Sequence, residues 1–93
     1  MDIIFSQPFV IVERKIERTG QRTIEEEHTI ELYVDRIRAG QEDFALGDVF
    51  DVSYRFTSAL YGFLYLHTNR GVVSYIIKKD PSIFIEEYKK LIQ

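Results

Sequence analysis

Apolar and polar residues alternate most clearly in the last third of the chain, where two strand-like segments precede one helical segment. The segments GFLYLHT (residues 62–68) and VVSYIIK (residues 72–78) flank the turn Asn69-Arg70-Gly71. Gly71 can supply the left-handed position of a three-residue connection. This pattern predicts a β-hairpin.

A C-terminal helix is predicted over about residues 81–92, because apolar side chains recur there every three or four positions. Asp80 is a good N-cap, and Pro81 fits the first helical position, where its missing N–H costs nothing. Glu86 and Lys90 have the spacing of a favourable pair along a helix. The apolar stripe must be buried, and the open end of a small barrel is its natural place. Its members are Phe84, Ile85, Tyr88, Leu91 and Ile92.

The first third of the chain predicts two strands joined by a tight turn. A β-branched run begins at residues 9–12, and a polar stretch follows at residues 17–22, in which Gly20 can take a positive φ. Residues 23–33 then return as a half-buried strand with alternating apolar and polar positions. The run Glu25-Glu26-Glu27 could instead start a helix, since glutamate favours one.

Short strands are also predicted at residues 36–39 and 49–56, with a brief apolar piece at residues 44–46. In the segment 49–56 the residues expected to face the core are Phe50, Val52, Tyr54 and Phe56. About seven strands at spacings of roughly 8 to 12 residues are typical of a sandwich or barrel rather than of βαβ units. We therefore predict a mainly β fold, a barrel of about seven antiparallel strands capped by one C-terminal α-helix.

The composition fits a single domain over residues 1–93, with its strands within residues 8–78. A net charge of −3 and a pI of about 5.3 argue against a nucleic-acid partner, which would favour a basic protein. The chain has no cysteine, which excludes disulfides and thiolate chemistry. Neither a targeting segment nor an apolar run of about 18 residues is visible, so a cytoplasmic location is expected by default.

The second half of the chain resembles a family of small bacterial pleckstrin-homology (PH)-like domains that includes relatives of the sublancin immunity protein. The matching stretch is LYGFLYLHTNRGVVSYIIKKDPSIFIEEYKKLI, preceded by IELYVDRIRAG. Its most specific part is the Gly-x-Leu-Tyr-Leu-His-Thr-Asn-x-Gly turn that leads to Tyr75 and then to Asp80-Pro81. The resemblance covers residues 29–93. It implies a PH-like barrel without enzymatic activity.

A basic group around the first predicted turn is one candidate binding site. Its members are Arg14, Lys15, Arg18 and Arg22. In lipid-binding PH domains, basic side chains at this place converge on the phosphates of inositol lipids. Five glutamates on the same segment would partly cancel the field, and alternating charges along a ribbon are more often a solvated surface.

Aromatic residues between positions 54 and 75 form the other candidate site. Phe63 and Tyr65 share one face of their predicted strand, and Leu64 and Leu66 share the other. If the leucines are in the core, Phe63 and Tyr65 form an exposed ladder suited to a protein partner or to a second copy. If the aromatic residues are in the core, the leucines are outside.

No catalytic or metal-binding constellation is visible, and no cofactor is expected. His28 and His67 are the only histidines, and neither has a second ligand or a carboxylate at a fixed spacing. His67 is expected to be a surface or turn residue. No serine lies in a nucleophile-elbow context such as Gly-x-Ser-x-Gly.

These observations favour a non-enzymatic PH-like interaction module that binds a protein or peptide partner. The contact would use an exposed strand edge or the aromatic face, since any open edge offers backbone groups for pairing. One alternative is weak membrane-surface or anionic-lipid binding through the basic group. Another, implied by the family resemblance, is immunity-type protection against a bacteriocin-like peptide. A homo-oligomer is also compatible with so many aromatic residues in a small acidic domain.

Overall fold

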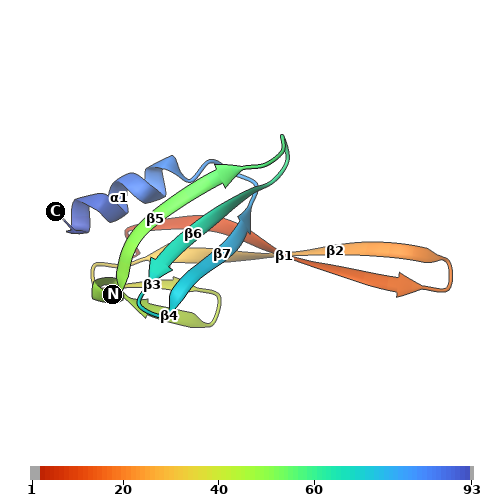
Figure 1. The fold of residues 1–93 in the computed structure, drawn as a ribbon, viewed down its shortest axis with the longest axis horizontal. Coiled ribbons are helices and arrows are strands. Elements are labelled where there is room, and N and C mark those ends of the chain that lie inside the picture. The colour runs from red at the N-terminus through yellow and green to blue at the C-terminus, as the bar shows by residue number, and fades with distance from the viewer. Residues whose placement is uncertain (1–2, 93) are drawn as a thin grey trace.

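The structure is a computed structural model that describes residues 3–92, apart from the side chain of Arg14. Four strands are followed by a short 3-10 helix and then by three more strands, and one α-helix ends the described chain (Figure 1). The elements are β1 (Phe5–Glu17), β2 (Gly20–Leu32), β3 (Arg36–Ala39), β4 (Glu42–Ala45), the 3-10 helix η1 (Leu46–Asp48), β5 (Val49–Phe56), β6 (Gly62–Thr68), β7 (Gly71–Ile77) and α1 (Ser82–Ile92).

All seven strands form one antiparallel sheet in the order β4-β3-β2-β1-β7-β6-β5. The predicted mainly β fold with seven strands and a C-terminal helix is confirmed. The sheet does not close, because β4 and β5 remain as its two edges among the described residues. The protein is therefore barrel-like only in a loose sense.

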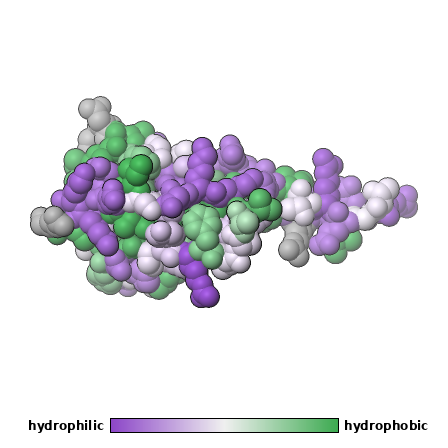
Figure 2. Space-filling model, turned by 90° about the horizontal axis from the view of Figure 1, so that it is seen from above, coloured by the Kyte–Doolittle hydropathy of each residue, from purple (hydrophilic) through white to green (hydrophobic). Residues whose placement is uncertain are grey.

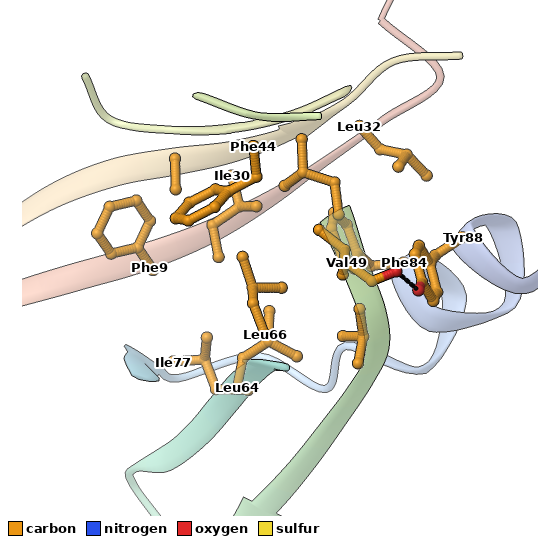
Figure 3. Packing of buried hydrophobic residues seen from close by; sticks show 13 residues of the cluster. Phe9, Ile30, Leu32, Phe44, Val49, Leu64, Leu66, Ile77, Phe84 and Tyr88 are labelled. Carbon is orange, nitrogen blue, oxygen red and sulfur yellow. Dashed lines mark hydrogen bonds between the residues drawn. The ribbon is translucent and has the colours of Figure 1, made fainter. Parts of the chain in front are cut away.

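The apolar core lies on the concave face of the sheet, where α1 packs across it (Figure 3). Phe84 and Tyr88 of α1 are fully buried, and the Tyr88 hydroxyl donates a 2.9 Å hydrogen bond to the carbonyl oxygen of Val49. The predicted burial of the helix stripe is thus confirmed for Phe84 and Tyr88, with Ile85 and Leu91 partly buried beside them, but it is wrong for Ile92, which is 49% exposed. The core residues from the strands are Phe9, Ile30, Leu32, Ile37, Ala39, Phe44, Val49, Val52, Leu64, Leu66 and Ile77.

The start of α1 follows the predicted capping chemistry. A side-chain oxygen of Asp80 accepts a 2.7 Å hydrogen bond from the backbone N–H of Ser82 and a second hydrogen bond from the Ser82 hydroxyl. The bond from the hydroxyl and then the bond from the backbone N–H lower the pKa of Asp80. The expected Glu86–Lys90 pair is wrong. Lys90 instead lies 3.1 Å from a carboxylate oxygen of Glu87, one position closer along the helix.

The predicted core face of β5 is wrong for three of its four residues. Val52 is buried, but Phe50, Tyr54 and Phe56 are 64%, 42% and 39% exposed, and Val49 is buried instead. The pairing of β5 with β6 shifts between Val49 and Asp51, which indicates a β-bulge. The extra residue puts Val49 on the same face as Val52 and leaves Phe50 exposed, whereas Tyr54 and Phe56 keep the face predicted for them. Beyond Val52, the concave face is less completely covered.

β1 and β2 are longer than the sequence pattern predicted, and much of their length protrudes from the body. Each has thirteen residues, and they pair with one another from Phe5–Leu32 to Glu17–Gly20. β7 pairs with β1 only at Val10, and β3 pairs with β2 only from Ile30 onward. Residues 11–28, here called the arm, form a two-stranded ribbon that extends to the right in Figure 1. The molecule accordingly measures 52 × 26 × 25 Å.

We expect Tyr88→Phe to lower the free energy of unfolding by about 1–3 kcal/mol, because it leaves the buried Val49 carbonyl without its hydrogen-bond donor. Urea denaturation of the variant and the wild type measures the difference. Tyr54→Phe, at an exposed tyrosine, is the matched control and should change stability by less than about 0.5 kcal/mol. Equal effects of the two substitutions would contradict the anchoring role of Tyr88.

Candidate functional site

The structure places the predicted basic group on the arm without making it converge. Lys15 and Arg22 are cross-strand partners, Arg18 lies in the turn, and all three are exposed. Arg22 Nη1 lies 4.0 Å from Glu17 Oε1, so carboxylates are interleaved with these cations. The side chain of Arg14 lies outside the described part of the structure. Figure 2 shows the arm as a narrow, mostly hydrophilic extension of a body on which hydrophobic residues gather.

The predicted aromatic ladder exists on the convex face of β6. Leu64 and Leu66 are fully buried in the core, which decides between the two alternatives left open by the sequence. Phe63 and Tyr65 therefore point to the opposite face, as predicted, but both are half-buried there and not fully exposed. Their rings stack with centroids 6.2 Å apart.

A serine–histidine contact next to this ladder was not expected from the sequence. Ser53 on β5 and His67 on β6 form a hydrogen bond of 2.8 Å between Oγ and Nε2. His67 lies near the end of β6 and is half-buried, so it is a partly exposed strand residue and not a turn residue. Asp51 is the cross-strand partner of His67, yet among the described residues no carboxylate lies within ion-pair distance of that ring. The contact is therefore a polar pair between neighbouring strands that lacks the third, orienting group of a Ser-His-Asp triad in the described structure.

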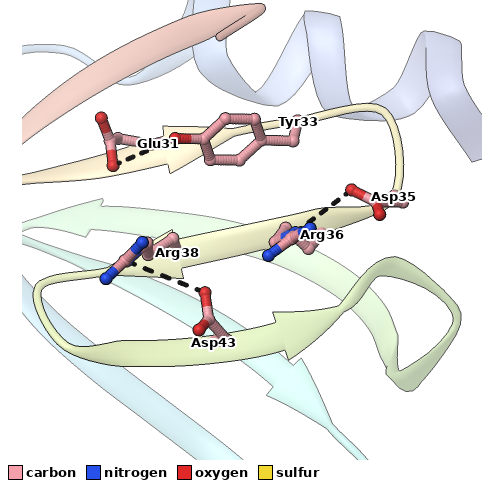
Figure 4. Close-up of polar contacts among 6 residues, drawn as sticks. All are labelled: Glu31, Tyr33, Asp35, Arg36, Arg38 and Asp43. Atoms are coloured by element: carbon pink, nitrogen blue, oxygen red, sulfur yellow. Dashed lines mark hydrogen bonds and ion pairs between the residues drawn. The ribbon is translucent and has the colours of Figure 1, made fainter. Parts of the chain in front are cut away.

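One edge of the body, β4, is short and highly charged. The strand has only four residues, and Arg38 Nε of the adjacent β3 lies 3.9 Å from Asp43 Oδ1 on β4 (Figure 4). Nearby, Arg36 Nε lies 3.3 Å from Asp35 Oδ1, and the Tyr33 hydroxyl lies 3.4 Å from Glu31. Short length and charged side chains are common ways in which proteins protect an edge strand from pairing with another chain.

The opposite edge, β5, has a longer row of backbone groups without a neighbouring strand. The Thr57 N–H donates to the carbonyl of Tyr61 at 3.2 Å, in line with the β5–β6 pairing. Because hydrogen-bonded and non-hydrogen-bonded pairs alternate along antiparallel strands, the N–H and C=O groups of Val52, Tyr54 and Phe56 point away from β6. β5 is an edge strand, so they point toward open space.

Exposed aromatic side chains accompany this edge. The rings of Tyr54 and Phe56 touch edge to face, with centroids 6.1 Å apart, and Phe50 is the most exposed of the three aromatic residues on β5. β5 contains neither lysine nor proline, and its only charged residues are Asp51 and Arg55. It therefore lacks most of the protection seen at β4. The aromatic positions were visible in the sequence, but their exposure was not. The exposure of Phe50 depends on the bulge, and that of Tyr54 and Phe56 on the incomplete cover of the concave face beyond Val52.

A groove of about 1110 Å³ lies where β1 diverges from β7. Phe9 forms part of its floor, with its ring stacked on His28 at 5.5 Å and in edge contact with Tyr75 at 5.0 Å. The lining includes four glutamates and neither lysine nor arginine among the described residues; the glutamates are Glu26, Glu27, Glu31 and Glu42. An acidic rim disfavours phosphate, so this groove does not continue the basic group of the arm.

Two polar atoms beside the groove lack hydrogen-bond partners among the described residues. They are the Tyr75 hydroxyl oxygen and His28 Nε2, which lies 3.3 Å from Glu26 Oε1 without the alignment of a hydrogen bond. Burial, followed by the charge of Glu42, raises the pKa of Tyr75 to about 12, although the nearby Arg70 opposes this shift. A buried hydroxyl of this kind is costly to ionise.

No family model, no curated protein and no solved structure matches the chain. The resemblance to PH-like domains therefore stays a prediction. Within residues 3–92, no helix is long and apolar enough to cross a membrane. No group of three or more histidine, aspartate or glutamate side chains with metal-binding geometry occurs in that same part of the chain.

We expect Tyr75→Phe to reduce the loss of stability at alkaline pH. In the unfolded chain a tyrosine ionises near pH 10, whereas in the folded protein the pKa of Tyr75 is about 12. The stability that comes from keeping Tyr75 neutral is therefore fully present below about pH 10. It is lost as the pH rises toward 12, because the unfolded chain then loses a proton that the folded protein keeps. Urea denaturation at intervals from about pH 9 to 12 should show a shallower decline for the variant. A slope equal to that of the wild type would contradict this assignment. At neutral pH the variant should be about as stable as the wild type, because the hydroxyl has no partner to lose.

Proposed function

We propose that the protein is a non-enzymatic interaction module that binds an extended segment of a protein or peptide partner along the edge of β5. The observation that carries this proposal is the row of outward backbone groups at Val52, Tyr54 and Phe56 on an unprotected edge strand. A partner strand would satisfy these groups by β-augmentation.

The side chains around the edge indicate which partner fits. Tyr54 and Phe56 lie on the concave side of β5, as their cross-strand partners Leu64 and Gly62 show. An added strand would place alternate side chains beside these rings, so apolar residues at every second position are favoured. Proline is disfavoured in such a segment, because it lacks the N–H that the pairing requires.

The anionic-lipid alternative has no comparable support. Lys15, Arg18 and Arg22 are interleaved with glutamates, and the groove near the base of the arm is acidic. Immunity-type protection would be one biological use of a peptide-binding edge, and the resemblance to the family is its only support.

The test is selection from a library of random peptides, followed by calorimetric affinity measurement with the enriched sequences. We expect enriched peptides to alternate apolar and polar residues and to bind Tyr54→Ala more weakly than the wild type. Tyr54→Pro should bind more weakly still, because it also removes the outward N–H. Since that N–H does not face β6, proline is tolerable at this edge position.

The comparison of Tyr54→Pro with Tyr54→Ala separates backbone pairing from side-chain contact. Both variants should unfold in urea cooperatively, which shows that the domain is intact. Equal affinities for the two variants would contradict strand addition. Peptides whose binding perturbs the amide resonances of β4 or of the convex face, while leaving those of β5 unchanged, would place the site elsewhere.

A further inference from the structure

The arm is a two-stranded ribbon that contacts the body near its base, where the Glu25 carboxylate accepts hydrogen bonds from the Lys78 ammonium and the Tyr61 hydroxyl. Beyond Val10 on β1 and before Thr29 on β2, no third strand flanks it in the described structure. Ile16 is 89% exposed and Ile11 is 44% exposed. An isolated two-stranded hairpin is only marginally stable in water, so a ribbon of this length needs a further partner.

β2 presents a free row of backbone groups along the arm. The Gly40 N–H donates to the carbonyl of Thr29, so the backbone groups of Thr29 point away from β1. The alternation along an antiparallel pair makes every second residue toward the tip point the same way; these are Glu27, Glu25, Thr23 and Gln21. The free stretch runs from Gly20 to His28, and its midpoint is Ile24.

Two copies of this stretch match one another in antiparallel register about Ile24. In that register Gly20 of one copy lies opposite His28 of the other, so the whole free edge is used. Thr23 faces Glu25 of the second copy, and both residues have outward backbone groups, so the pair can exchange hydrogen bonds. The two copies of Ile24 face one another in a non-hydrogen-bonded position, where cross-strand side chains approach most closely.

Charge favours this register over the symmetric registers that are centred on a charged residue. In the register centred on Ile24, Arg22 of each copy lies opposite Glu26 of the other. The dimer therefore contains two such contacts. A register centred on Arg22, Glu25 or Glu26 would place two identical charges opposite one another, which is destabilising. Within one copy Arg22 already faces Lys15 across the ribbon, and Glu26 of the second copy would lie on its other side.

We propose that two copies of the chain associate through the β2 edges of their arms, in antiparallel register about Ile24. The result is a continuous four-stranded antiparallel sheet with the two bodies at opposite ends. This interface is separate from the β5 edge, so it goes beyond the proposed function and leaves β5 free in each copy.

Disulfide trapping tests the register directly, because the chain has no cysteine of its own. At a non-hydrogen-bonded antiparallel pair the Cα atoms are about 4.5 Å apart, within the range that a disulfide spans. Ile24→Cys should therefore form a covalent dimer on mild oxidation much faster than Ile16→Cys, the matched control on β1. Equal or faster trapping of Ile16→Cys would overturn the proposal.

Sedimentation across a range of concentrations gives the second test. The wild type should be a reversible dimer. Arg22→Glu and Glu26→Arg should each raise its dissociation constant roughly tenfold or more, because each replaces two attractive contacts with repulsive ones. The double variant should recover most of the wild-type affinity. A wild type that stays monomeric throughout, or a double variant as weak as the single ones, would contradict the proposed interface.

The same measurement separates this interface from the site proposed on β5. Tyr54→Pro should leave the dimer intact, because β5 takes no part in it. Loss of the dimer in Tyr54→Pro would place the contact between copies on β5 and overturn the arm interface. Failure of the peptide selection, by contrast, would bear only on the proposed function.

Discussion

The burial of Phe84 and Tyr88 against the concave face of the sheet is the contact on which the rest of the structure depends. A curved sheet of seven strands has one apolar face, and in the described structure α1 is the element that covers it. Each of these two aromatic side chains contributes a large apolar area, and losing one from a core typically costs a few kcal/mol. The Tyr88 hydroxyl also fixes the position of α1 relative to the start of β5, because it donates a hydrogen bond to the carbonyl oxygen of Val49.

The two edges of the body differ in how well they are protected from pairing with another chain. α1 is anchored near the beginning of β5, but the outward backbone groups from Val52 to Phe56 have no neighbouring strand. At the other edge, the shortness of β4 and the ion pair between Arg38 and Asp43 discourage pairing. The open edge with aromatic neighbours is therefore the place where the fold is best suited to receive another chain.

The spacing of apolar residues, together with capping and turn residues, predicted the elements whose boundaries are set by the local sequence. The helix and its Asp80 cap, the strand Arg36–Ala39, the strand Val49–Phe56 and the hairpin of β6 and β7 were all visible in the sequence. Gly20 and Gly71 both adopt positive φ values, as expected, although the second turn contains two residues rather than three. These features follow from short-range rules that a single sequence carries.

Other features depend on register between distant strands, which periodicity does not specify. The bulge between Val49 and Asp51 buries Val49 and leaves Phe50 exposed, although strict alternation had placed Phe50 inside. Tyr54 and Phe56 stay on the same face as Val52, and they are exposed because the cover of that face does not reach them. The contact between Ser53 and His67 likewise exists only because β5 and β6 pair as they do. The length of the arm was missed because its strands carry charges on both faces, so apolar periodicity disappears where pairing continues.

Native-state amide hydrogen exchange along β5 tests the central claim most directly. The account predicts an alternation in which the amides of Ser53 and Arg55, which face β6, exchange slowly, while those of Val52, Tyr54 and Phe56 exchange quickly. Uniform strong protection along the strand in the isolated domain would contradict an open edge, because the outward amides would then already have partners.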